Sequence, residues 1–314
     1  MLGKTAGGLY WMSRYLERSE NIARLIEAGQ RIALTRSSDD DEDEWLSVMQ
    51  TAGVNVGYSQ YYDEVTRDQA IDWMLRDKDN PSSVLSVMEA ARNNARLVRT
   101  ALTREVWESI NAAWMRLKEA LARKVSERDL PEVLQLIRQR SAFVRGAMHG
   151  TMLRNDIYNF ARIGTFVERA DSTARILDVK YYVLLPSATA VGSSIDNVQW
   201  QTILRSVSAE GGFQMIYGQN PRPREIAQFL ILDRQLPRSL AFCCDKIRDN
   251  LGYLVADYGT RLPCHDLSDK LALKTMSHSI DEIIEFGLHE FIQDFLDGIH
   301  ALGAQIEIDY RFYE

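Results

Sequence analysis

The sequence LYWMSRYLERSENIARLIEAGQR, residues 9–31, has a clear helical period. Its apolar residues recur at spacings near three, four or seven, which places them along one side of an α-helix. They are Leu9, Met12, Leu16, Ala23 and Ile26. Because this stripe is long and continuous, the segment predicts a long helix with one side buried in a core.

A second stripe on the same segment carries charge. Its members are three or four residues apart and therefore share a face: Glu17, Glu20, Arg24, Glu27 and Arg31. The stretch TFVERADSTARILD, residues 165–178, repeats this pattern at the same offsets with Glu168, Asp171, Arg175 and Asp178, and Arg169 repeats Arg18. An internal duplication explains the shared register. A weaker echo in residues 83–100 lacks the Glu-Arg doublet.

The composition is that of a globular protein. The chain has 314 residues, 46% of them hydrophobic, and a formal net charge of −7. This length is sufficient for a substantial core, and the acidic balance argues against a protein that coats nucleic acid. Helical periods run through most of the chain, so we predict an all-α multi-helix bundle. We expect one domain over residues 1–314, with pseudo-repeat halves of about 1–130 and 131–314.

Several features bear on location. There are three cysteines and no CxxC pair, which fits a reducing cytosol, so we expect a cytoplasmic protein. The N-terminus lacks the apolar run of a signal peptide, and no stretch of about 18 apolar residues is present, so we expect no membrane partner. We also expect residues 1–8 to be a flexible lead-in and Ile306–Tyr310 to be an irregular tail.

The duplicated charges suggest a polar centre. We expect the two helices to pair antiparallel or crossed, so that Arg18 and Arg24 meet Glu168 or Asp171. In the same way, Arg169 and Arg175 would meet Glu17 or Glu20. The cluster would then be a buried structural network, or a site for a phosphate or carboxylate ligand or a partner. A solvated surface stripe is the third interpretation.

Other candidate chemistry is weaker. His278, His289 and His300 are eleven residues apart, so neighbours on one helix would be about 16 Å apart and could not share a metal. We therefore expect no metal site, and we expect no cofactor because GxxxxGK[ST], GxGxxG and GxSxG are absent. The acidic run Ser37–Glu44 is interpreted as a solvated loop, with a cation or basic-partner site as the alternative. The arginines of proline-containing turns, among them Arg238, are interpreted as solvated, with anion contact as the alternative.

The two signature stretches, LYWMSRYLERSENIARLIE and NFARIGTFVERADSTARILD, resemble those of the bacterial alpha-E family, an all-α family with a Glu-Arg motif. Further segments, such as FLILDRQLPRSLAFC, are also similar to that family. The resemblance covers nearly the whole chain and implies an all-helical fold. Its motif falls on Glu17, Arg18, Glu168 and Arg169, with Arg24 and Arg175 one or two turns on.

The resemblance also implies genes nearby for a circularly permuted ATP-grasp ligase, a transglutaminase-like peptidase and sometimes a proteasome-like hydrolase. It carries over no catalytic residues. Our first expectation is a non-catalytic companion of the ligase, which binds the ligase or its peptide substrate or product through the paired Glu-Arg helices. The alternative is an enzyme of the same pathway, with Glu17 or Glu168 as general base. The adjacent Arg18 or Arg169 would oppose the raised pKa that such a base needs.

Overall fold

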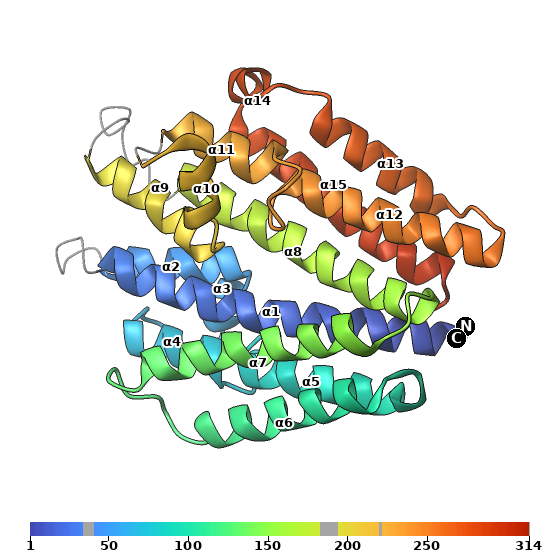
Figure 1. The fold of residues 1–314 in the computed structure, drawn as a ribbon. Helices are drawn as coiled ribbons and strands as arrows, with labels where there is room; N and C mark the ends of the chain where they lie inside the picture. The colour runs from blue at the N-terminus through green and yellow to red at the C-terminus, as the bar shows by residue number, and fades with distance from the viewer. Residues whose placement is uncertain (34–40, 183–193, 220–221, 314) are drawn as a thin grey trace.

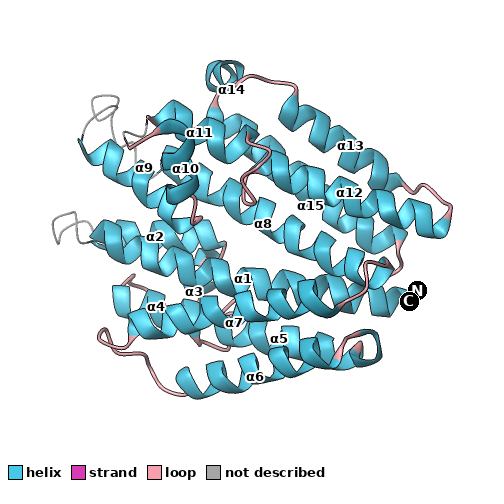
Figure 2. Cartoon of the chain, in the orientation of Figure 1, coloured by secondary structure: helices cyan, strands magenta, loops and turns pink. Residues whose placement is uncertain are grey.

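The computed structural model describes residues 1–33, 41–182, 194–219 and 222–313. Within these residues the chain forms α-helices and one short 3₁₀ helix and no strand, which confirms the all-α class (Figures 1 and 2). Part of the acidic run, residues 37–40, lies outside the described residues. The helices are α1 (Gly3–Ala33), α2 (Asp41–Ala52), α3 (Asn55–Tyr58), α4 (Arg67–Leu75), α5 (Val84–Leu97), η2 (Arg99–Ala101), α6 (Arg104–Ala120), α7 (Leu130–Thr151), α8 (Asp156–Tyr182), α9 (Ser194–Ser206), α10 (Glu210–Tyr217), α11 (Pro223–Leu232), α12 (Leu240–Tyr258), α13 (Pro263–Met276), α14 (Ile280–Phe286) and α15 (Leu288–Asp309).

The two chain ends are ordered and pack on each other, contrary to the expected flexible lead-in and irregular tail. Helix α1 already begins at Gly3, and α15 continues to Asp309. The ring of Phe312 is buried, and its centroid lies 5.3 Å from that of Tyr10. Burial of such aromatic surface stabilises both termini. Figure 1 shows the N- and C-termini side by side.

Helices α1 and α8 lie against each other at the centre of the bundle and run in the same direction (Figure 1). Tyr10 faces Gly164, and Asn21 hydrogen-bonds Ser172, so contacting residues keep a nearly constant separation along the chain. In an antiparallel pair the sum of the two contacting residue numbers would be constant instead. The expectation of an antiparallel pair is therefore wrong. Gly164 allows the close approach, because a Cβ there would lie 2.2 Å from the Tyr10 carbonyl oxygen.

The remaining helices repeat one packing pattern around this pair. Helix α1 packs on α5, α7 and α9, and α8 packs in the same way on α12, α15 and α2. The equivalent pairs are α1 with α8, α2 with α9, α3 with α10, α4 with α11, α5 with α12, α6 with α13, and α7 with α15. By this packing, the two halves meet between α7 and α8, later than the residue-130 division drawn from the sequence. The weaker echo of the charged stripe, in residues 83–100, falls on α5. The counterpart of α5 is α12, and not α1 or α8.

Local details support the approximate two-fold relation. Each half contains a stacked ring pair with a third ring edge-on, at similar spacings: centroids 4.7 Å apart for Tyr58 and Tyr62, with Trp73 edge-on, and 4.8 Å apart for Phe213 and Tyr217, with Phe229 edge-on. The helices α2 and α9 also end in the same turn. Gly53 and Ser208 each adopt a left-handed conformation, with φ of +69° and +54°. Their N–H groups donate to the carbonyls of Gln50 and Arg205 respectively, so these two positions are equivalent.

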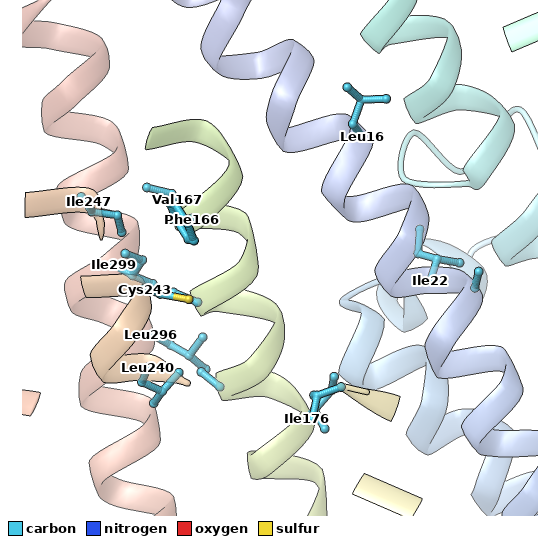
Figure 3. Packing of buried hydrophobic residues seen from close by; sticks show 14 of the residues in the cluster. Leu16, Ile22, Phe166, Val167, Ile176, Leu240, Cys243, Ile247, Leu296 and Ile299 are labelled. Carbon is cyan, nitrogen blue, oxygen red and sulfur yellow. The ribbon is translucent and has the colours of Figure 1, made fainter. Parts of the chain in front are cut away.

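The core extends from α1 to the C-terminal helices. Figure 3 shows core side chains on α1, α8, α12 and α15. They are Leu16 and Ile22 on α1, Phe166, Val167 and Ile176 on α8, Leu240, Cys243 and Ile247 on α12, and Leu296 and Ile299 on α15. Full burial of an aliphatic side chain contributes about 1.5–3 kcal/mol to folding. This core fixes α8 between α1 and the C-terminal helices, and so it also fixes the polar residues on the α1–α8 interface.

Candidate functional site

The two Glu-Arg doublets form reciprocal ion pairs across the α1–α8 interface. Arg18 donates through Nε to Glu168 Oε1 at 2.5 Å and through Nη2 to Oε2 at 3.1 Å. Arg169 donates to Glu17 through the same two nitrogens at 2.9 and 3.0 Å. Both pairs are bidentate, the geometry that guanidinium and carboxylate groups favour. Exchange of the two halves converts one pair into the other, which places the approximate two-fold axis between the helices.

Three further arginines join this centre. Arg238, which precedes α12, donates to Glu20 Oε1 at 2.9 Å, and Arg145 of α7 lies 3.3 Å from Glu17. Arg14 donates to Glu168 at 2.8 Å. Sequence reasoning did not place Arg14 or Arg145 at the centre, and it interpreted Arg238 as a solvated turn residue. Arg238 is buried because its loop crosses α1 next to Glu20. No local pattern signals such a long-range contact.

Arg24 and Arg175 do not cross the interface as expected. Each pairs with the acid one turn earlier on its own helix, Arg24 with Glu20 at 2.6 Å and Arg175 with Asp171 at 2.9 Å. An (i, i+4) pair is within easy reach on one helix face. Asp171 also contacts His300 Nε2 at 2.6 Å. These two arginines therefore lie at the edges of the centre rather than between the helices.

The four acids of the centre are buried, and their pKa values are lowered. Glu17 is 1% exposed and Glu168 is 2% exposed. Burial alone would raise the pKa of Glu17, but Arg169, Arg238 and Arg145 outweigh it and lower that pKa well below its usual range. The pKa values of Glu20, Glu168 and Asp171 are lowered for the same reason. These carboxylates therefore stay ionised, and none is suited to accept a proton near neutral pH.

Two polar cavities flank the centre. The first, which we call the Ser82 pocket, has a volume of about 160 Å³ and lies between α1, α2 and α8, with Arg18, Ser82, Asp171 and Arg175 in its wall. The second, the arginine pocket, has a volume of about 260 Å³ and lies between α1, α7, α9 and α10. Its charged residues are Arg24, Arg31, Arg138, Arg205, Glu27 and Glu210. Both cavities are reached from the surface, and Glu168 also lines the Ser82 pocket, whereas Glu17 lines neither cavity.

The histidines are separated by breaks in the C-terminal helices. His278 lies in the turn before α14, and not on one continuous helix with the other two as the sequence suggested. His289 contacts Asp178 at 2.6 Å, and His300 contacts Asp171. In the part of the chain that the structure describes, no group of three or more His, Cys, Asp or Glu residues is arranged to hold a metal ion. Nor does any helix there have the length and apolar character needed to cross a bilayer.

Comparison with known proteins gives a family match over nearly the whole chain. The Alpha-E family model, described as a predicted alpha-helical domain with a conserved ER motif, matches residues 1–310. Three relatives are each 25% identical over 324 aligned residues: the uncharacterized protein Mb2597 of Mycobacterium bovis, and the uncharacterized proteins MT2643 and Rv2567 of Mycobacterium tuberculosis. The alignment covers 93% of this chain and 35% of each relative, so the chain spans about a third of their length. No solved structure gives a significant match.

Proposed function

The chain belongs to the alpha-E family, and on that premise we propose that it is a non-catalytic companion of an ATP-grasp amide or peptide ligase. In this proposal it binds the ligase, or the ligase's peptide substrate or product. The partner is the circularly permuted ATP-grasp enzyme that the family resemblance implies, with the transglutaminase-like peptidase as a further partner. A cytoplasmic location is part of the proposal, because such a ligase draws on cytosolic ATP.

One observation carries the choice of binding over catalysis. The four acids of the centre, Glu17, Glu20, Glu168 and Asp171, are buried against guanidinium groups, and the pKa of each is lowered. A general base works best with a pKa near the working pH, which needs a raised carboxylate pKa. The geometry of Glu17 and Glu168 therefore weighs against the enzyme alternative, in which one of them removes a proton from a substrate.

The same burial limits how the paired helices can take part in binding. A partner cannot reach Glu17 or the mostly buried Arg169 without separating α1 from α8. The edges of the centre are more open, because the side chains of Arg18 and Arg175 are 27% and 31% exposed. In our proposal the Glu-Arg pairs hold the two halves together, and a partner or peptide contacts the arginines at the edges.

The test is co-purification of the tagged chain with the ATP-grasp ligase encoded beside it. We expect a complex that survives size-exclusion chromatography, and no ATP hydrolysis or peptide turnover by the isolated chain. The variant R175Q removes an edge cation that lies outside the reciprocal Glu-Arg pairs, and it should weaken the complex. The matched control R104Q removes an exposed cation that pairs with Glu108 in α6, and it should leave the complex unchanged. Absence of a complex, together with turnover by the chain alone, would reverse the proposal.

A further inference from the structure

The arginine pocket carries an excess of positive charge. Among the described residues that line it, four guanidinium groups face two carboxylates, which leaves a net charge of about +2. Arg31 and Arg138 share Glu27, Arg205 pairs with Glu210 at 2.9 Å, and Arg24 pairs with Glu20, which lies outside the lining. A guanidinium has five N–H donors, so these ion pairs use only part of the N–H donors of the four arginines. Such an excess of donors and charge suits an oxyanion.

The backbone adds to this character. Helix α10 begins at Glu210, and its N-cap Ala209 provides no side-chain cap. The first N–H groups of an α-helix have no partner within the helix and carry a partial positive charge. Glu210 and Gly211 from this first turn line the pocket, and a Cβ at Gly211 would meet nothing within 4 Å. The arginines and the helix start therefore act on the same space.

The duplicated fold provides an internal control. The turn that ends α9 is repeated at the end of α2, where Gln50 stands in the place of Arg205. Gln293 of α15 donates to Asp178, the counterpart of Glu27, just as Arg138 of α7 donates to Glu27, so Gln293 stands in the place of Arg138. The same helix arrangement is thus built in the other half without either arginine. The fold does not require Arg138 or Arg205, so their convergence on one cavity needs another reason.

The residue at position 208 supports the same inference. Its counterpart Gly53 adopts a left-handed conformation without steric cost, whereas a residue with a Cβ is disfavoured there. The Ser208 hydroxyl accepts a hydrogen bond from Arg24 and lines the pocket. The position therefore keeps a polar side chain inside the cavity where its counterpart has none.

We propose that the arginine pocket binds a phosphate dianion, either free phosphate or the phosphate of a small phosphomonoester. A charge of −2 matches the net positive charge of the residues that line the pocket. The tetrahedral arrangement of the phosphate oxygens suits hydrogen-bond donors that lie on α1, α7, α9 and at the start of α10. A cavity of about 260 Å³ holds roughly eight water molecules at about 30 Å³ each, which leaves room for part of an organic group.

The test is isothermal titration calorimetry of the full chain at constant ionic strength. The ligands are inorganic phosphate, phosphoserine and a tri-glutamate peptide. Saturable binding of phosphate or phosphoserine is expected, and the stronger of the two identifies the source of the anion. The variant R138Q/R205Q installs the residues of the other half, so it should fold. Its affinity should fall roughly tenfold or more, because charge-assisted hydrogen bonds are lost.

The control is R224Q, which removes an exposed cation paired with Asp281, and its affinity for phosphate should equal that of the parent chain. Circular dichroism establishes that both variants keep the helical fold. The proposal is overturned if neither phosphate nor phosphoserine binds, if only the tri-glutamate peptide binds, or if folded R138Q/R205Q binds phosphate as the parent does. Because no ligase is present, these outcomes leave the companion proposal untouched.

Discussion

Arg238 occupies in the second half of the chain the place that Ser82 occupies in the first. Each follows a proline and precedes the serine that caps the next long helix, Ser83 for α5 and Ser239 for α12. The guanidinium of Arg238 fills the space beside Glu17 and Glu20, whereas the Ser82 side leaves a cavity of about 160 Å³. The two halves thus share a backbone arrangement but not a charge arrangement.

Replacement of Arg238 by Ser should therefore be tolerated by the fold at moderate cost. Arg169, Arg145 and Arg24 still face the two carboxylates, and burial already lowers the pKa of Arg238 to about 10. We expect a loss of about 1.5–3 kcal/mol in the free energy of unfolding, as for hydrogen bonds to charged groups. Urea unfolding followed by circular dichroism measures it. A loss as large as that of E17Q would show that Arg238 is the main partner of the acids.

Glu17→Gln should be more severe, because it leaves the buried Arg169 and Arg238 and the partly exposed Arg145 around a neutral amide. Removal of one partner of a buried ion pair costs about 3–5 kcal/mol. E168Q should behave similarly, since Glu168 holds Arg14 and Arg18. The urea midpoint measures the effect. The matched control E108Q, in an exposed pair with Arg104, should not move the midpoint; equal midpoints for E17Q and the parent chain would contradict a structural role for the centre.

Stability should fall in acid. The pKa values of Glu17 and Glu168 are lowered in the folded state from the ordinary 4.5. Their stabilising contribution is therefore fully present above pH 4.5, and it is lost as the pH falls below that value towards the folded pKa. The free energy of unfolding is measured by urea titration at a series of pH values between 7 and 3. It should fall most steeply with decreasing pH below pH 4.5. In E17Q the acid slope should be smaller, and an unchanged slope would mean that Glu17 does not contribute.

Gly164→Ala should force α1 and α8 apart. The added Cβ would lie 2.2 Å from the Tyr10 carbonyl oxygen, which belongs to backbone and cannot rotate away. Overpacking of this kind costs about 1–3 kcal/mol, measured as a lower unfolding midpoint. Gly146→Ala is the matched control, because a Cβ there meets nothing within 4 Å and the residue lies inside α7. That variant should be as stable as the parent or more stable by up to about 1 kcal/mol.

The sequence determined the local features of this protein. A 3.6-residue period is written into each segment, so the long helices at residues 9–31 and 165–178 follow from residue order alone. The register between the Glu-Arg doublets also shows in the sequence, because a duplication preserves offsets. Ion pairs within one helix, such as Glu27 with Arg31, depend only on spacing.

Only the tertiary structure decided how these helices meet. The shared direction of α1 and α8 and their close approach at Gly164 exist only in the folded chain, and the burial of Glu17 depends on helices brought from distant parts of the chain. Arg145 and Arg238 reach the centre from 128 and 218 residues away. The physical reason is that solvent exclusion, and with it the strength of every charge interaction in the centre, arises only when segments far apart in the chain are packed together.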